Sequence, residues 1–177
     1  MILQALTLEQ CEQVRLWRNN CLETLRTPYP LTKEMQEVFY RDVVCNRNSP
    51  HRYWAIKDTE SFIGMGGITN IETVNRIGEI SIIIDPALRR NGYGEKAVEL
   101  LLDAAFNQMG LNCVYGECYA TNYDGMVFWN KIVRKYDCSQ VILRSRKFWQ
   151  GKFWDSLYFD ILKDEYDKIS ATTNGTL

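Results

Sequence analysis

Three strand-like runs follow one another near the middle of the chain, with only short connections between them. The runs cover residues 53–57, 62–71 and 78–85, and the connections 58–60 and 74–76 carry turn-forming Asp and Asn. Connections this short leave no room for a crossover helix, so neighbouring strands must run in opposite directions. The pattern predicts an antiparallel meander, and the rest of the fold has to be built around it.

Helices and further strands are predicted on both sides of this meander. Residues 2–6 are typical of a first strand, and Thr7 and Thr32 are suitable N-caps for two helices. The strongest amphipathic pattern covers residues 94–109 and stops at Gly110, a residue that ends helices readily. The remaining expected elements are a strand over 113–119, a helix over 122–134, and two strands over 138–143 and 153–162.

Length and composition indicate one domain. A chain of 177 residues with 46% hydrophobic content can bury one sizeable core and is short for two. We therefore expect a single domain over residues 1–169, followed by a disordered tail over residues 170–177. The net charge of -1 offers no broad basic surface, which disfavours nucleic acid or a membrane as partner. The first residues lack a basic region and no apolar run could span a bilayer, so a cytoplasmic protein is expected.

The segment between the third run and the long helix carries the clearest functional signal. After Asp85-Pro86 the chain reads Arg89-Arg90-Asn91-Gly92-Tyr93-Gly94 and then enters the helix. Glycines let backbone N–H groups turn toward an anion, the helix N-terminus adds partial positive charge, and the two arginines add full charges. The segment therefore predicts a binding site for a pyrophosphate.

Two other interpretations of this segment stay open. Asn91-Gly92 alone could form an ordinary turn, and residues 92–97 fit the G-x-G-x-x-A pattern of dinucleotide-binding folds. That pattern follows a first parallel strand closely, whereas here residues 86–91 intervene and the preceding strands are predicted to be hairpins. A dinucleotide-binding fold is therefore disfavoured.

The R-x-x-G-x-G pattern between a strand and an amphipathic helix resembles the coenzyme A motif of the GNAT acetyltransferase superfamily. Asn122, Trp129 and Lys131 stand where that superfamily has its N-x-x-A-x-x-x-Y-x-K pattern, and the order of elements fits from residue 2 to about 162. The resemblance implies an α+β fold with a mixed, mostly antiparallel central sheet splayed around a coenzyme A cleft, and helices on both faces. It also implies an acyl-CoA-dependent N-acetyltransferase that uses acetyl-CoA and needs no metal.

The same resemblance implies which residues bind acetyl-CoA. Backbone groups of Ile82, Ile83 and Ile84 would pair with the pantetheine arm like an added strand. The other implied binding residues are Arg89, Arg90, Asn91, Gly92, Tyr93, Gly94, Asn122, Trp129 and Lys131. Trp129 replaces a tyrosine that often serves as general acid in the family, and indole has no titratable proton to give at neutral pH. The acid is therefore open between Tyr119, Tyr123 and water.

Removal of a proton from the acceptor amine calls for a carboxylate that faces the cleft. Glu79 lies on the strand before the pyrophosphate segment and Glu117 on the strand after it, at positions that resemble those where GNAT branches place their base. Glu117 ranks first because it stands just ahead of Asn122, as in branches that acetylate N-termini and sugar amines. His51 is the only histidine and no G-x-S-x-G elbow is present, so a hydrolase is disfavoured.

The acceptor is the least constrained part of the prediction. The broader likeness is to the ribosomal-protein N-terminal acetyltransferase branch, whereas residues 17–19, 51–54 and 63–69 resemble segments of the sugar-nucleotide N-acetyltransferase of pseudaminic acid biosynthesis. Aromatic and arginine side chains in these segments suit a nucleotide sugar, because rings can stack on its base. The expected acceptor is a small-molecule amine, most simply an amino sugar or sugar nucleotide. The alternative acceptor is a protein N-terminus, and the alternative function is that of a catalytically silent CoA-binding module. The protein is expected to be a monomer or a homodimer.

Overall fold

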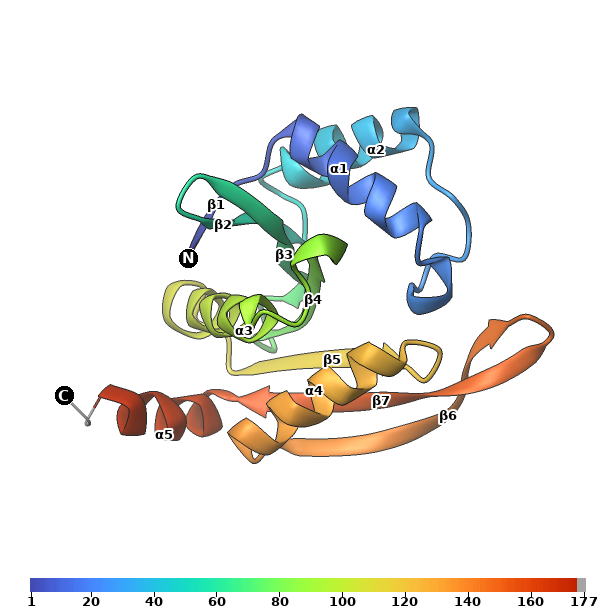
Figure 1. Ribbon diagram of the computed structural model, residues 1–177. Coiled ribbons are helices and arrows are strands. Elements are labelled where there is room, and N and C mark those ends of the chain that lie inside the picture. Colours follow the sequence, from blue (N-terminus) through green and yellow to red (C-terminus); the bar gives the residue numbers. More distant parts are fainter. Residues whose placement is uncertain (175–177) are drawn as a thin grey trace.

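The computed structural model describes residues 1–174, which contain seven strands and five α-helices (Figure 1). The strands are β1 (Ile2–Ala5), β2 (Arg52–Asp58), β3 (Ser61–Glu72), β4 (Ile77–Ile84), β5 (Cys113–Tyr119), β6 (Ser139–Trp149) and β7 (Lys152–Leu162). The helices are α1 (Leu8–Asn19), α2 (Lys33–Phe39), α3 (Tyr93–Asp103), α4 (Tyr123–Tyr136) and α5 (Lys163–Asn174). Within these described residues, no helix is both long and apolar enough to cross a membrane.

All seven strands belong to one sheet, in the order β1-β2-β3-β4-β5-β7-β6. Every neighbouring pair is antiparallel except β4 and β5, which run parallel. The expected α+β fold with a mixed, mostly antiparallel sheet is therefore confirmed. The meander β2-β3-β4 lies where the sequence predicts it, and β5 has the predicted bounds.

The sheet is joined at β4 and β5 over a short distance only. The two strands pair from Ile77 with Cys113 to Glu79 with Tyr115, and the described chain contains no further pair between them. Beyond that point β4 continues along β3, and β5 continues along β7. The sheet therefore splays open directly after Glu79, and we call the space between the two diverging strands the opening.

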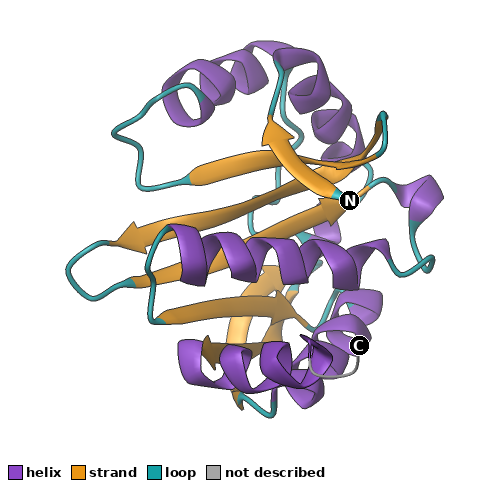
Figure 2. Ribbon diagram, turned by 90° about the vertical axis from the view of Figure 1, so that its left-hand side faces the viewer, coloured by secondary structure: helices purple, strands orange, loops and turns teal. Residues whose placement is uncertain are grey.

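Helices cover both faces of the sheet, as expected (Figures 1 and 2). On one face Val14 of α1 packs in a cluster with Met65 of β3. On the other face Val98 of α3 and Ile132 of α4 pack in a cluster with Phe159 of β7. Hence α1 and α2 lie on one face of the sheet, and α3 and α4 lie on the other.

β6 is longer than the sequence indicates. The prediction ends this strand at Leu143, but the strand resumes its pairing with β7 at Lys147 and continues to Trp149. The interruption at residues 144–146 is a β-bulge, in which extra residues of one strand stand opposite a single residue of its partner. The bulge breaks the alternation of apolar and polar residues, which is why the pattern stops early.

The C-terminal helix α5 also differs from the prediction, which has a disordered tail from residue 170. The helix continues through residues 170–174. It is stabilised by Tyr166, whose ring lies 5.2 Å from that of Phe106 between centroids, and by an ion pair between Lys163 and Asp167. The rest of the predicted tail, residues 175–177, lies outside the described part of the chain.

Candidate active site

The predicted pyrophosphate segment forms the turn between β4 and α3. Gly92 is the N-cap of α3 and has φ 80°, a left-handed conformation that favours glycine. A Cβ atom at Gly92 would meet nothing within 4 Å, so the backbone conformation rather than crowding explains the glycine. No side chain caps the first turn of α3, which leaves its N–H groups available to an anion.

The two arginines of this turn lie at its surface. Arg90 also has a positive φ, 64°, and forms an ion pair at 3.2 Å with Asp124 in the first turn of α4. Arg89 donates from Nε to the carbonyl oxygen of Ile84 at 3.4 Å. The turn after β4 and the start of α4 therefore lie side by side, and two helix N-termini point their partial positive charge toward the same end of the opening.

The remaining residues of the segment shape this turn. Asn91 donates from Nδ2 to the carbonyl oxygen of Leu88 at 3.3 Å. Tyr93 begins α3 and packs against the apolar cluster at its base. A Cβ atom at Gly94 would lie 3.1 Å from the ring of Phe128, so the glycine allows α3 to approach α4 closely.

Asn122 caps the helix that follows β5. Its Oδ1 accepts a hydrogen bond from the backbone N–H of Gly125 at 3.0 Å. A Cβ atom at Gly125 would lie 2.2 Å from Nδ2 of Asn122, which explains the small residue at this position. Asn122 thus stands at the N-terminus of α4, beside the helical turn that pairs with Arg90.

The last two residues of the N-x-x-A-x-x-x-Y-x-K pattern lie away from this group. Trp129 is buried, with its ring centroid 4.8 Å from that of Phe159. Lys131 forms an ion pair at 2.5 Å with Glu95 of α3. The structure therefore places Trp129 in the core beneath α4 and Lys131 between the two helices, while the residues from Arg89 to Gly94 and Asn122 are brought together.

The end of β4 offers a free backbone edge. Ile82, Ile83 and Ile84 pair with β3 on one side, opposite residues 64–66. On the other side the pairing with β5 has already ended at Glu79. Backbone groups on such an edge can accept an extended ligand as an added strand, which is the arrangement expected for a pantetheine arm.

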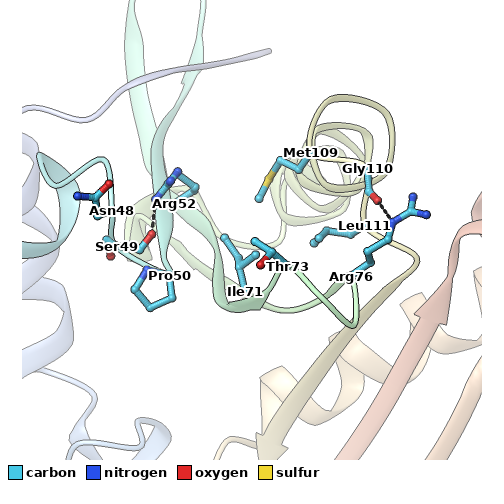
Figure 3. A pocket seen from close by; sticks show the side chains of 10 residues that line it. All are labelled: Asn48, Ser49, Pro50, Arg52, Ile71, Thr73, Arg76, Met109, Gly110 and Leu111. Carbon is cyan, nitrogen blue, oxygen red and sulfur yellow. Dashed lines mark hydrogen bonds between the residues drawn. The ribbon is translucent and has the colours of Figure 1, made fainter.

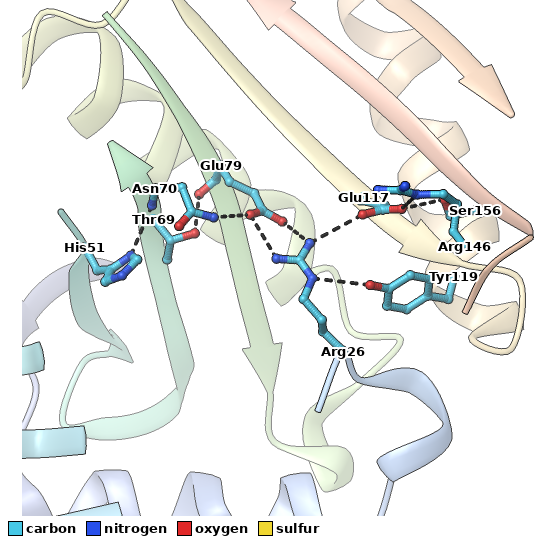
Figure 4. Close-up of polar contacts among 9 residues, drawn as sticks. All are labelled: Arg26, His51, Thr69, Asn70, Glu79, Glu117, Tyr119, Arg146 and Ser156. Atoms are coloured by element: carbon cyan, nitrogen blue, oxygen red, sulfur yellow. Dashed lines mark hydrogen bonds and ion pairs between the residues drawn. The ribbon is translucent and has the colours of Figure 1, made fainter. Parts of the chain in front are cut away.

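Glu79 and Glu117, the two predicted candidates for the base, lie on either side of the opening and face each other across it (Figure 4). Their side chains are largely buried, with 11% and 8% exposed. Arg26 contacts both: its Nη2 lies 2.7 Å from Oε1 of Glu79 and 3.5 Å from Oε2 of Glu117. The two carboxylates thus form one cluster that a guanidinium bridges.

Both oxygens of Glu79 are occupied. Arg26 donates to Oε1 at 2.7 Å and to Oε2 at 3.2 Å, and Asn70 donates to Oε2 at 2.7 Å. The hydrogen bonds to Glu79 raise the pKa of Arg26 above its ordinary value, so this guanidinium stays charged. Glu79 therefore holds Arg26 in a fixed bidentate arrangement.

The oxygens of Glu117 are occupied unequally. Its Oε1 accepts hydrogen bonds from the hydroxyl of Ser156 at 2.7 Å and from Nε of Arg146 at 3.2 Å. Within the described residues, Oε2 has only the 3.5 Å contact with Arg26, which is at the limit for a hydrogen bond. Oε2 of Glu117 is therefore the carboxylate oxygen of the cluster with the weakest hydrogen bonding.

Arg26 is carried by the connection between α1 and α2, and this connection is fixed to the opposite side of the opening. Lys147 of β6 is buried, and its ammonium donates to the carbonyl oxygens of Leu22, Glu23 and Leu25. Thr121 donates from its hydroxyl to the same Glu23 carbonyl at 2.5 Å. Burial lowers the pKa of Lys147, but the carbonyl oxygens provide acceptors for its ammonium.

Tyr119 completes this side of the opening. Its hydroxyl accepts a hydrogen bond from Nε of Arg26 at 3.3 Å. The ammonium of Lys147 lies 5.0 Å from the centroid of its ring, within the range of a cation–π contact. Tyr119 thus lies in the same cluster as the two carboxylates, whereas Tyr123 is exposed at the start of α4.

The side chains expected at a nucleotide-binding entrance are half-buried and have partners within the protein. Trp17 stacks on Phe62 with centroids 5.6 Å apart, and Tyr53 packs edge-on against Phe39 at 5.2 Å. The guanidinium of Arg52 donates to backbone carbonyls of its own loop. These residues therefore contribute to packing and loop structure.

A cavity of about 670 Å³ lies at the other end of β4 from Gly92 (Figure 3). Its lining includes Arg52, Ile71, Arg76 and Met109. Arg76 donates from Nε to the carbonyl oxygen of Gly110 at 2.6 Å, so its charge, like that of Arg52, is directed at backbone. Neither Glu79 nor Glu117 lines this cavity, and both lie at the opening.

Several residues of the cluster are not predicted from the sequence. They are Arg26, Asn70, Arg146, Lys147 and Ser156. Arg26 stands in an irregular connection, and Arg146 and Lys147 follow the predicted end of their strand. The only usable signal is the cationic run from Arg144 to Lys147, and nothing in its spacing connects it with Glu117.

Comparison with known proteins agrees with this architecture. A family model described as acetyltransferase (GNAT) domain matches residues 1–125. The spermidine N-acetyltransferase of Vibrio cholerae in complex with CoA and spermine is similar, with a TM-score of 0.79 and 20% identity over 93% of this chain and 96% of that chain. Mutant forms of the spermidine/spermine N-acetyltransferase SpeG of Vibrio cholerae give a TM-score of 0.79 and 20% identity over 95% and 96%. At this identity, the likeness to the solved structures concerns the fold alone.

The family match covers the meander, the turn at Gly92 and the cap at Asn122. It therefore spans the whole R-x-x-G-x-G segment and the first four residues of the second pattern, from Asn122 to Gly125. It also spans most of the chain. The protein belongs to the GNAT family of acetyltransferases and is an acyl-CoA-dependent N-acetyltransferase, with acetyl-CoA as the acyl donor of that family.

Proposed function

We propose that the protein transfers the acetyl group of acetyl-CoA to the primary amine of a small molecule, with Glu117 as the general base. The position and partners of Glu117 carry this proposal. It stands two residues beyond the last β4–β5 pair, where the sheet opens, and its Oε2 is the least occupied carboxylate oxygen of the cluster. A base must reach the proton that it removes, and this oxygen has the fewest hydrogen bonds to give up to an entering amine.

The reaction balances without any further reactant. The acceptor ammonium gives one proton to Glu117, and the free amine nitrogen then forms a bond to the acetyl carbon as the bond from that carbon to sulfur breaks. The nitrogen gives its second proton to the departing sulfur, so that the products are an amide and free coenzyme A thiol. Tyr119 is the candidate donor on the path of this second proton, because its hydroxyl lies in the same cluster.

Glu79 has a different role in this proposal. Because both of its oxygens hold Arg26 or Asn70, it positions the guanidinium beside Glu117 and does not itself take the proton. The exchange of these two roles is the main alternative within the same chemistry.

For the donor, we assign the pyrophosphate to the N-terminus of α3 with Arg89, Arg90, Asn91, Gly92, Tyr93 and Gly94. The uncapped first turn of α3 and the left-handed Gly92 fit such an anion. The pantetheine arm is assigned to the backbone of residues 82–84 and to Asn122. Trp129 and Lys131 would then act at a distance, by supporting α4 and its contact with α3.

Two acceptors deserve direct comparison. An amino sugar or sugar nucleotide is the acceptor that the sequence favours, with a protein N-terminus behind it. A polyamine is the second candidate, because the proteins that share the fold are named spermidine N-acetyltransferases. The two classes differ in charge, which allows one experiment to separate them.

The test is thiol release from acetyl-CoA with a panel of amines that includes amino sugars, nucleotide amino sugars, polyamines and short peptides. Turnover that depends on the amine and yields the matching acetamide would support the proposal. Coenzyme A binding without turnover of any amine would instead indicate a catalytically silent module.

A further inference from the structure

We infer that the acceptor carries an anionic group, a phosphate or a carboxylate, in addition to its primary amine, and that Arg26 and Arg146 bind this group. The inference rests on the proposed function, because it names the class of acceptor for the same site. It also separates this chain from the spermidine N-acetyltransferases that share its fold, since spermidine carries only positive charges.

Both carboxylates of the cluster have cationic partners before any acceptor enters. Glu79 is paired with Arg26, and Glu117 contacts both Arg26 and Arg146. A polycation would have to compete with these guanidiniums for the carboxylates, whereas an acidic group on the acceptor could pair with the guanidiniums directly.

Both guanidiniums keep donors for a ligand. The side chains of Arg26 and Arg146 are 57% and 52% exposed, although the carboxylates that they contact are largely buried. Arg146 has five N–H donors, and within the described residues only Nε has a partner, Oε1 of Glu117. Its two terminal nitrogens are thus available for the bidentate pairing that guanidiniums make with phosphate and carboxylate.

Arg26 and Arg146 contact different oxygens of the Glu117 carboxylate. Arg146 reaches Oε1 of Glu117 and Arg26 reaches Oε2, so the carboxylate lies between them (Figure 4). An acceptor whose anionic group is held by these guanidiniums would therefore have its amine close to Oε2. Such anchoring orients the amine for proton removal. This orientation raises the reaction rate by more than tighter binding alone would.

The bulge in β6 is what aims Arg146 at Glu117. Residues 144–146 stand opposite Asp155 alone, because Leu143 pairs with Ser156 and Lys147 with Trp154. Ser145 has φ 55°, a left-handed conformation that disfavours a non-glycine residue, and its N–H donates to Oδ1 of Asp155 at 2.8 Å. Such a conformation persists only where its surroundings enforce it, and bulges commonly re-aim side chains next to active sites.

The experiment compares kcat/KM for matched acceptors that differ in one acidic group. Glucosamine 6-phosphate is compared with glucosamine for the phosphate arm, lysine with cadaverine for the carboxylate arm, and spermidine represents the polycations. We expect kcat/KM for the acidic member of at least one pair to exceed that of its partner by about tenfold or more, because charge-assisted hydrogen bonds stabilise the bound acidic acceptor by about that factor. The arm with the larger ratio identifies the anion.

Two variants locate the effect. Arg146→Gln should reduce the ratio of kcat/KM values within the pair by about tenfold, because kcat/KM falls more for the acidic acceptor than for its partner. Arg26→Gln should reduce the ratio similarly and raise the kcat/KM of spermidine relative to glucosamine, since Glu79 is then released to bind a cation. Arg41→Gln is the control. Arg41 is an exposed arginine in the helical turn after α2, where it pairs with Asp42, and its replacement should leave every ratio of kcat/KM values as in the wild type.

Equal kcat/KM values within both pairs, or spermidine as the best acceptor of the wild type, would overturn the inference. So would a ratio that both arginine variants leave intact. If no amine is acetylated, the proposed function fails, and calorimetric titrations of glucosamine 6-phosphate and of lysine into the protein saturated with coenzyme A decide the inference separately. Binding of either compound that Arg146→Gln removes would support the anion site, and binding of neither by the wild type would refute it.

Discussion

The two sides of the opening are built in different ways. The side that we assign to the donor consists of the turn at Gly92, the cap at Asn122 and the edge of β4, and what it offers is mostly backbone N–H and C=O groups. The acceptor side consists of charged side chains from three separate places, namely Arg26 before α2, Glu79 and Glu117 on the strands, and the bulged part of β6.

This difference explains what each side can tolerate. Backbone groups at a helix N-terminus are positioned by a few local conformations, so the donor side depends on particular glycines. The acceptor side depends on contacts between residues far apart in the chain, so it can change its charge pattern without altering the donor side. A variant on one side should therefore leave ligand binding on the other side largely unchanged.

The largest effect is expected from Glu117→Gln. The change keeps the size of the side chain but removes its basicity, so kcat at neutral pH should fall by ~10²–10⁴-fold, the usual contribution of a general base. Coenzyme A affinity, measured by calorimetry, should stay near the wild-type value. Activity should recover partly at high pH, where the free amine is already abundant.

Glu79→Gln is the matched control for this variant. It should impair acceptor binding through Arg26 and raise KM more than it lowers kcat. If Glu79→Gln instead abolishes kcat while Glu117→Gln keeps it, the two roles must be exchanged. If neither variant changes the pH profile of kcat, the proton leaves through solvent.

Gly92→Val should act on the donor side alone. Valine disfavours φ 80° and adds a side chain where a pyrophosphate would approach, so coenzyme A affinity should fall by about tenfold or more. Gly151→Val is a control of the same kind, because Gly151 has φ 79° and equally open surroundings but lies in the β6–β7 turn. Equal affinities for coenzyme A in the two folded variants would remove the turn at Gly92 from the donor site.

Lys147→Met should act on the acceptor side. The variant removes the ammonium that holds three carbonyls of the connection carrying Arg26, so acceptor KM should rise by about tenfold while coenzyme A affinity is kept. Lys152→Met changes an exposed lysine on the same hairpin and should leave KM as it is. A rise in KM with Lys152→Met of the same size would show that hairpin charge, and not the fixed connection, is responsible.

The smallest effect is expected from Asp124→Asn. Asp124 pairs with Arg90 at the surface, and its removal frees the arginine for the pyrophosphate. Exposed pairs contribute less than about 1 kcal/mol, so coenzyme A affinity should rise by a factor of about two to five. The gain should shrink at high salt, because screening weakens contacts between exposed charges. A loss of affinity would mean that Asp124 orients Arg90 for the ligand.

The sequence predicts the secondary structure of the assigned donor side well because its information is local. A strand, a glycine-rich turn and an amphipathic helix follow one another within a short stretch, and the turn at Gly92 adopts the left-handed conformation that its glycine permits. The bounds of β5 are also those predicted. Glu117 therefore lies near the end of that strand, and Asn122 lies after it at the start of α4, as expected. The roles of these residues in catalysis and binding remain predictions.

The acceptor side could not be predicted in the same way. Arg26 meets Glu117 only because the chain folds back across the opening, and no periodicity in the irregular connection around Arg26 indicates this. The bulge in β6 hides Arg146 and Lys147 from a search for alternating residues. Conversely, the aromatic residues Trp17 and Tyr53 suggest a binding platform in the sequence, and in the structure both are half-buried and pack against other rings.

The attachment of the α1–α2 connection to Lys147 has a consequence for the order of folding. The part of this connection from Leu22 to Leu25 can make its contacts with Lys147 only after β6 has formed, since these hydrogen bonds join positions 122 to 125 residues apart. Closing so long a loop costs entropy before the contact stabilises the chain. During synthesis, the donor turn can therefore form well before the acceptor cluster is assembled. In the finished protein, amide hydrogens of residues 21–27 should exchange through local opening more readily than those of the central strands.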